Sequence, residues 1–159
     1  MFVCSGNICR SPIAHAVVEE RIRSAGLQKS ISLESSGTTS YHLGDDVDRR
    51  ARAELARHGI RFRHRARLFR PADLDEYDLI LTMDRGNYRS VLRLADERQR
   101  EKVRMFRTYD PEGGEDAEVP DPYYGATDGF GRVYEIIDRS ADALVRALSG
   151  SKVGSHERS

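Results

Sequence analysis

The chain has 159 residues, of which 38% are hydrophobic and 33% charged, and its 26 basic and 26 acidic residues give a formal net charge of zero. This length suits one domain with a substantial core, and the neutral balance suggests neither nucleic acid nor a membrane surface as a partner. No stretch has the apolar length of a membrane span, the start does not read as a signal peptide, and two cysteines fit free thiols in a reducing compartment, so we expect a cytoplasmic protein.

The first half of the chain alternates apolar runs with amphipathic segments. A first strand ends at Phe2-Val3, and a helix is predicted from residue 12 to about residue 25. A second strand is predicted over residues 30–35, followed by a polar loop. The apolar spacing of residues 46–58 predicts another helix, which Gly59 ends.

The second half continues this alternation. In chain order we predict a loop over 62–71, a short helix over 71–76, a buried strand over 77–83, a helix over 87–95, a strand over 102–106, a long loop over 108–125, a helix over 128–148 and a disordered tail over 149–159. Long loops without secondary structure in compact domains are usually functional, which directs attention to 108–125. The predicted domain is residues 1–148.

Strands that alternate with helices predict an α/β fold: a four-stranded parallel sheet with helices on both faces, in a flavodoxin-like order 2-1-3-4. Ligands of such sheets bind beyond the carboxyl ends of the strands. Cys4, Ser35, Asp84 and the loop around Asp121 all lie at or after predicted strand ends. We therefore expect them to meet in one site.

The segment Cys4-Ser-Gly-Asn-Ile-Cys-Arg-Ser-Pro12 leads from a strand into a helix. Gly6 can take a positive φ freely, and Asn7 is the kind of non-glycine residue that tolerates it best. Ser11 is a favoured N-cap and Pro12 a favoured first helical residue. Such a loop points backbone N–H groups at one spot near a helix N-terminus, where an anion binds and a cysteine becomes a nucleophile.

This segment resembles the phosphate-binding loop of the low-molecular-weight protein tyrosine phosphatases, and Asp121-Pro-Tyr-Tyr-Gly125 resembles their general-acid loop. The resemblance covers the chain from Phe2 to about Leu148. It implies the family's phosphotyrosine phosphatase I-like fold and hydrolysis of phosphotyrosine in proteins, and of small aryl phosphates, through a cysteinyl-phosphate intermediate. Cys4 would be the nucleophile, Arg10 would bind phosphate and Asp121 would act as general acid and then base. We expect no metal and no cofactor.

The resemblance also assigns supporting roles. Ser11 would hydrogen-bond the Cys4 sulfur, and a reversible Cys4–Cys9 disulfide would protect the nucleophile from peroxide. We expect tyrosine-phosphorylated proteins as partners and a monomer, with weak self-association allowed. The remaining candidates are the phosphate loop with Ser5, Gly6, Asn7, Ile8, Cys9 and Ser11, the supporting residues Ser35, His64 and Asp84, of which the last two match a buttressing pair, and a substrate slot walled by Tyr41, Tyr123 and Tyr124.

Other functions remain open. Protein-arginine phosphatases of this fold resemble the loop but carry threonine where Ile8 stands. Arsenate reductases of the fold use additional cysteines, which this chain lacks. A silent phosphotyrosine-binding module would have lost the nucleophile or the acid. A zinc site built from Cys4, Cys9 and His15 lacks a fourth ligand.

Nine of the 23 arginines fall between Arg49 and Arg70. The simpler interpretation is a solvated helix face, and the alternative is a docking surface for acidic segments of phosphoproteins. Asp45, Asp46, Asp48 and Glu54 dilute the positive charge, which argues against nucleic acid.

Overall fold

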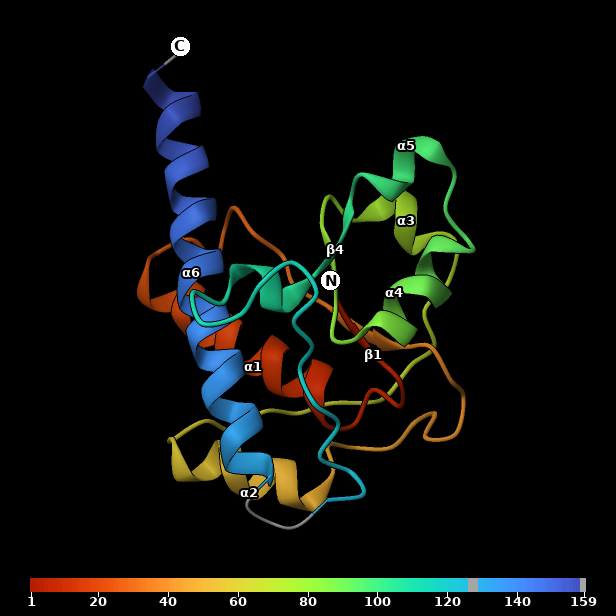
Figure 1. Ribbon diagram of the computed structural model, residues 1–159. Coiled ribbons are helices and arrows are strands. Elements are labelled where there is room, and N and C mark those ends of the chain that lie inside the picture. Colours follow the sequence, from red (N-terminus) through yellow and green to blue (C-terminus); the bar gives the residue numbers. More distant parts are fainter. Residues whose placement is uncertain (126–128, 158–159) are drawn as a thin grey trace.

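The computed structural model describes residues 1–125 and 129–157 and contains a four-stranded sheet between two layers of helices (Figure 1). All neighbouring strands are parallel, in the order β2-β1-β3-β4. The predicted fold class and strand order are therefore confirmed. The strands are β1 (Phe2–Cys4), β2 (Ser35–Gly37), β3 (Ile80–Thr82) and β4 (Val103–Met105).

Helices connect the strands and cover both faces of the sheet. The long final helix packs along α1 and also contacts α2, whereas α4 packs on β3 and β4. The helical elements are α1 (Arg10–Ser24), α2 (Arg49–Arg57), α3 (Asp73–Glu76), α4 (Arg85–Leu92), α5 (Glu97–Arg100), the 3-10 turn η1 (Phe106–Tyr109) and α6 (Gly129–Glu157).

The two faces of the sheet bury separate apolar clusters, because successive side chains of a strand point to opposite faces. Phe2 lies in the cluster beneath α1 and α6, where its ring meets Phe106 edge-on at 5.4 Å between centroids. Val3 lies in the second cluster with Leu74 and Val91, on the side of α3 and α4. Burial on both faces explains why the sequences of β1 and β3 are nearly continuous apolar runs.

The second strand lies later in the chain than residues 30–35, where the sequence predicts it. Ser35 pairs with Phe2 and Gly37 with Cys4, so β2 begins only where the chain comes opposite the first residue of β1. Ile31 and Leu33 still pack against the core, which produces the apolar alternation that suggested a strand. Ser35 therefore begins β2 and does not end it.

Several helix boundaries also differ from the prediction. Helix α1 begins at Arg10 with Cys9 as its N-cap, so Ser11 is not the cap and is free to bond elsewhere. Asp48 caps α2 by accepting from Arg50 N. Residues 97–100 form α5, which the sequence did not predict, although Asp96 and Gln99 form a capping box there.

Helix α6 continues to Glu157, so the backbone of residues 149–157 is helical where the sequence predicts a disordered tail. Extending an existing helix needs no new nucleus, which offsets the weak propensity of the Ser and Gly residues there. The predicted start of this helix, Asp128, lies outside the described residues.

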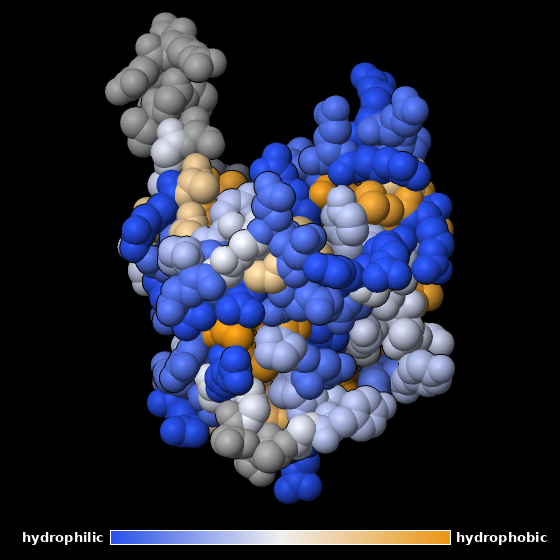
Figure 2. Space-filling model, in the orientation of Figure 1, coloured by the Kyte–Doolittle hydropathy of each residue, from blue (hydrophilic) through white to orange (hydrophobic). Residues whose placement is uncertain are grey.

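The face of the molecule in Figure 2 is largely hydrophilic, and apolar side chains show only in small areas. Within residues 1–125 and 129–157, none of the helices combines the length and the apolar character needed to cross a bilayer.

A buried carboxylate anchors the segment between α2 and α3. Asp73 is fully buried and accepts two hydrogen bonds from the Arg67 guanidinium, at 3.0 and 3.1 Å, and one from Arg70 N at 2.8 Å. The same segment runs beside β2, where Gly37 N donates to Arg67 O and Phe69 N donates to Gly37 O. Asp73 thereby holds this segment against the edge of the sheet.

We expect Asp73→Ala to lower the free energy of unfolding by about 2–3 kcal/mol, because it leaves Arg67 without its buried partner. The loss is below that of a fully buried pair because the Arg67 side chain is 26% exposed. Urea denaturation measures it, with Glu76→Ala, an exposed acidic residue of the same helix, as the matched control. Equal effects of the two substitutions would contradict the anchoring role.

Candidate active site

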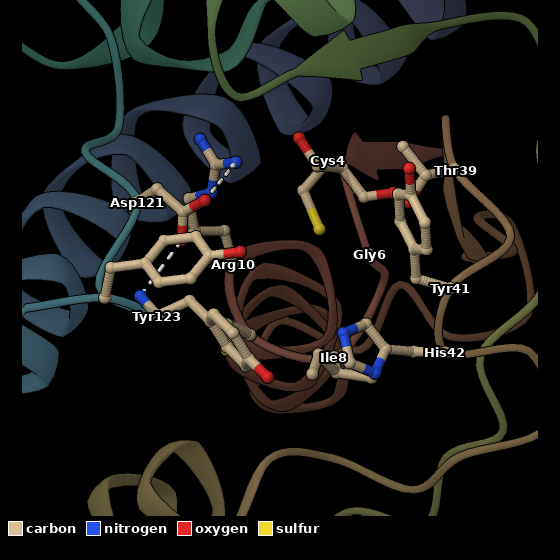
Figure 3. A pocket seen from close by; sticks show the side chains of 12 residues that line it. Cys4, Gly6, Ile8, Arg10, Thr39, Tyr41, His42, Asp121 and Tyr123 are labelled. Carbon is tan, nitrogen blue, oxygen red and sulfur yellow. Dashed lines mark hydrogen bonds and ion pairs between the residues drawn. The ribbon is translucent and has the colours of Figure 1, made fainter.

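A cavity of about 240 Å³ opens at the carboxyl edge of the sheet. Figure 3 shows the sulfur of Cys4 pointing into it, between Asp121 on one side and Tyr41 on the other. Three loops form its wall: the loop from β1 to α1, the loop after β2 and the loop before α6. The lining residues are Cys4, Ser5, Gly6, Ile8, Cys9, Arg10, Thr39, Tyr41, His42, Asp121, Tyr123 and Tyr124.

Asn7 fixes the shape of the β1–α1 loop from beneath. It is the one non-glycine residue with a positive φ (58°) among those that the structure describes. Its Nδ2 donates to Ser11 Oγ (2.8 Å) and to Ser35 Oγ (3.1 Å), and its Oδ1 accepts from Arg67 N (2.9 Å). One buried side chain thus ties the loop to α1, to β2 and to the segment anchored by Asp73.

Gly6 and Gly37 allow close packing around this loop, because a side chain at either position would collide with a neighbouring residue. The sequence suggests that Gly6 is needed for a positive φ. Gly6 does not have a positive φ, so the reason for a glycine there is a different one. A Cβ on Gly6 would lie 2.9 Å from His42 Cδ2, and a Cβ on Gly37 would lie 2.6 Å from Ser5 O. Gly37 therefore allows the loop to pack on β2, a role that the sequence analysis missed.

The Cys4 side chain is buried and held by two contacts. Ser11 Oγ lies 3.0 Å from its sulfur, and Asn7 N donates to the sulfur at 3.3 Å. Ser11 Oγ accepts from Asn7 Nδ2, and its own proton has two acceptors within reach, the Cys4 sulfur at 3.0 Å and Ser36 O at 3.5 Å. Ser11 thus bonds inside the loop where the sequence predicts a helix cap.

Arg10 is 2% exposed, and its guanidinium is fixed on one side. Nη1 donates to Asp84 Oδ2 (2.8 Å) and to Val119 O (3.0 Å), while Nη2 lies 3.6 Å from Asp121 Oδ2. Burial alone would lower the pKa of Arg10, but Cys4 and the two aspartates outweigh it and raise that pKa. The edge formed by Nε and Nη2 makes no hydrogen bond within the described residues; its one charged neighbour there is the half-exposed Asp121 carboxylate, at ion-pair distance from Nη2.

Asp84 connects this arginine to the start of α4. Its Oδ1 accepts from Asn87 N (2.7 Å) as half of a capping box, while its Oδ2 binds Arg10. Asn87 also donates through Nδ2 to Ser5 Oγ at 3.1 Å. The sequence analysis missed this role of Asn87, although the Asp84-x-x-Asn87 spacing is the signal that could have indicated it.

His64 supports the loop from the opposite side. Its Nε2 lies 2.6 Å from Asn7 O, and because a carbonyl oxygen only accepts, we assign the hydrogen to Nε2. Burial lowers the pKa of His64, which favours the neutral ring at pH 7. His64 and Asp84, the two residues expected to buttress the site, do so through separate contacts, His64 with Asn7 O and Asp84 with Arg10.

Asp121 and a group of aromatic side chains form the outer part of the pocket. Asp121 Oδ1 accepts from Tyr123 N at 3.0 Å, and its side chain is 43% exposed (Figure 3). The Tyr123 ring lies 4.8 Å from Tyr124 and 5.7 Å from His42, centroid to centroid. Tyr41 and Tyr124 stand at the rim, largely exposed. His42 and Thr39 are lining residues that no sequence pattern indicated.

Cys9 is buried, and both cysteines are free thiols. Burial, followed by the nearby carboxylate of Asp48, raises the pKa of the Cys9 thiol, so Cys9 stays protonated at neutral pH. In the described part of the chain, no three His, Cys, Asp or Glu side chains lie together in a way that could hold a metal ion.

The fold and the pocket together define a class of protein. It is a flavodoxin-like α/β protein with a cysteine and an arginine at the two ends of its β1–α1 loop, and with Asp121 of the loop before α6 in the same pocket. A family model described as low molecular weight phosphotyrosine protein phosphatase matches residues 1–153. The chain belongs to that family of phosphatases.

Individual relatives agree with this assignment. A low molecular weight protein-tyrosine-phosphatase from Streptomyces coelicolor is 44% identical over 149 residues, covering 92% of this chain and 91% of that protein. The crystal structure of a protein tyrosine phosphatase from Entamoeba histolytica superposes with a TM-score of 0.90 at 35% identity, covering 95% and 96%. A Drosophila arginine phosphatase superposes with a TM-score of 0.85 at 27% identity, covering 92% and 95%.

We expect Asn7→Ala to lower the free energy of unfolding by about 4 kcal/mol. The substitution removes three hydrogen bonds at about 1 kcal/mol each, and alanine tolerates the positive φ less well. Ser35→Ala, which removes one of those bonds, is the matched control and should cost about 1 kcal/mol. Equal losses in urea denaturation would show that Asn7 is not the residue on which the loop depends.

Proposed function

We propose that this protein hydrolyses phosphotyrosine in proteins through a cysteinyl-phosphate intermediate, with Cys4 as nucleophile, Arg10 as phosphate ligand and Asp121 as general acid and base. The observation that carries the proposal is the meeting of these three side chains in one pocket. The family of the chain supports the same reaction.

In the first step, the Cys4 thiolate attacks phosphorus while the bond to the tyrosyl oxygen breaks. The free Nε–Nη2 edge of Arg10 would bind two equatorial oxygens, and the backbone N–H groups of the loop would stabilise the charge that builds up there. Asp121 in its acid form gives its proton to the departing phenolate oxygen. The products are a cysteinyl-phosphate and the free tyrosine.

In the second step, water attacks the cysteinyl-phosphate and releases inorganic phosphate. Asp121, now a carboxylate, takes a proton from that water. The Cys4 sulfur leaves as a thiolate, which Ser11 stabilises by donating its hydroxyl proton across the 3.0 Å contact. The enzyme then returns to its starting state.

The pocket walls favour an aromatic substrate. Ile8, Tyr123 and Tyr124 offer apolar and aromatic surface to a planar phenyl group, with Tyr41 at the rim. The depth of the slot would let the long phosphotyrosine side chain reach Cys4, where phosphoserine is too short.

Protein phosphoarginine is the second candidate substrate, because an arginine phosphatase shares this fold. Its planar guanidinium would have to enter the same slot, past the buried and branched Ile8. The threonine that arginine phosphatases of this fold carry at that place is absent here, which ranks phosphotyrosine first.

Phosphate release from matched phosphotyrosine and phosphoarginine peptides, in EDTA and reductant, tests the proposal. We expect hydrolysis of phosphotyrosine that Cys4→Ser abolishes. We expect Asp121→Asn to lower kcat about 10²- to 10⁴-fold, and by less for aryl phosphates with acidic leaving groups, which need no proton from the enzyme.

Two results would contradict parts of this mechanism. A preference for phosphoarginine would change the substrate and leave the chemistry of the loop intact. A loss with Asp121→Asn that is equal for all leaving groups would remove the general-acid role.

We further propose that Cys9 protects Cys4 from oxidation. Hydrogen peroxide oxidises the Cys4 thiolate to a sulfenic acid, and the Cys9 thiol displaces water from it to form a Cys4–Cys9 disulfide. The buried, protonated Cys9 thiol inside the same loop supports this order of events.

After a brief peroxide treatment, we expect dithiothreitol to restore most of the activity of the wild type but little of the activity of Cys9→Ser. The Cys4 sulfenic acid of this variant lacks a neighbouring thiol and proceeds to irreversible acids. Assaying activity and intact mass before and after reductant gives both readouts. Full recovery of Cys9→Ser would overturn the protective role.

A further inference from the structure

The structure divides the nine arginines of residues 49–70 into two groups. Five of them form ion pairs with carboxylates: Arg50 with Asp48, Arg52 with Asp46, Arg57 with Glu54, and Arg67 and Arg70 with Asp73. The other four, Arg49, Arg61, Arg63 and Arg65, are exposed and have no carboxylate partner among the residues that the structure describes. Three of these four, Arg61, Arg63 and Arg65, occupy alternate positions in the segment 61–65.

The three arginine side chains of residues 61–65 lie on the same side of this segment. The rings of Phe62 and His64 stack at 5.9 Å between centroids, as side chains two residues apart do on one side of an extended chain. Phe62 also meets His15 at 4.8 Å, so this side faces the protein. Arg61, Arg63 and Arg65 therefore form an exposed row about 13 Å long, from four residue steps of about 3.3 Å. We call this row the arginine strip.

The arginine strip lies directly behind the phosphate loop. His64, between two of its members, bonds Asn7 O of that loop. Ala66, next to its end, pairs with the loop after β2: Ala66 N donates to Asp45 O (2.7 Å) and Gly44 N donates to Ala66 O (2.8 Å). That loop carries His42 of the pocket wall. A peptide that leaves the pocket past His42 therefore passes over the loop to which Ala66, the residue next to the strip, is hydrogen-bonded.

The carboxylates nearest to this segment leave its charge largely unopposed. Glu34 and Asp46 both raise the pKa of His64 by their charge, but Asp46 is already paired with Arg52. Asp45 is exposed and faces His42 at 3.4 Å. None of these three carboxylates forms an ion pair with Arg61, Arg63 or Arg65 in the described parts of the chain.

We propose that the arginine strip binds an acidic segment of the phosphoprotein substrate, a few residues away from the phosphotyrosine. This inference rests on the proposed function. An extended peptide presents alternate side chains at the same spacing as the strip, so Asp or Glu side chains match it one to one. The neutral charge of the whole chain favours such a local contact over binding to a long polyanion.

Two phosphotyrosine peptides test the proposal, one with a run of four glutamates beginning three residues from the phosphotyrosine and one with glutamines in their place. Each is made with the run on either side of the phosphotyrosine. The readout is the ratio of kcat/KM for the acidic over the neutral peptide. We expect a ratio of about five to ten at low salt, from three exposed ion pairs, and a ratio near one at high salt.

The triple substitution Arg61→Gln, Arg63→Gln and Arg65→Gln should bring this ratio close to one. The matched control removes three exposed arginines that also lack ion pairs within the described residues and lie in and between α4 and α5: Arg89→Gln, Arg93→Gln and Arg98→Gln. The control changes the net charge equally and should retain the ratio. Circular dichroism and thermal unfolding confirm that both variants fold.

An equal loss of the ratio in both variants would assign the effect to bulk charge and overturn the proposal. So would a wild-type ratio of one with active enzyme, or a ratio that the strip variant retains. Loss of binding to phosphatidylserine vesicles or single-stranded RNA in the strip variant, with the ratio retained, would assign the strip to those polyanions. No turnover of either peptide or of p-nitrophenyl phosphate would instead overturn the proposed function, and the substrate role of the strip with it.

Discussion

The geometry of the phosphate loop depends on one buried asparagine held in a left-handed conformation. A loop whose N–H groups converge on one point does not form spontaneously, because each residue could adopt other conformations at similar free energy. Asn7 removes that freedom by bonding Ser11, Ser35 and the backbone of Arg67 at once. These partners come from α1, β2 and the segment anchored by Asp73, so the loop is as rigid as the core beneath it.

A second constraint is the placement of a buried positive charge. Arg10 is almost completely enclosed, which would be costly for a guanidinium without partners. Asp84 and the carbonyl of Val119 satisfy one of its nitrogens and leave the opposite edge toward the cavity. Because Asp84 also caps α4, any movement of α4 would displace the arginine, and the site therefore depends on both layers of helices.

The sequence predicts the parts of this molecule that local patterns determine. The β1–α1 loop with Cys4 and Arg10, the loop around Asp121 and the strand order follow from motifs and from the alternation of strands and helices. The second strand was misplaced because pairing with β1, and not apolar alternation, decides which residues join the sheet. Ser11 was expected both as a helix cap and, from the resemblance, as a partner of the Cys4 sulfur; the structure has the second contact, while Cys9 occupies the N-cap position. His42 and Thr39 carry no local signal strong enough to place them at the pocket.

The arginine-rich segment is a second case in which tertiary contacts decide what the sequence leaves open. The sequence has no net charge but a basic middle segment, for which a solvated helix face is the simpler interpretation and a docking surface the alternative. Ion pairing in the folded chain separates them, because a paired arginine offers a partner little while an unpaired one offers its full charge. A short strip of unpaired arginines on a neutral protein favours selective contacts, since a protein that is basic throughout would bind polyanions of every kind. The distribution of pairing, more than the number of arginines, would therefore determine which acidic segments this surface could bind.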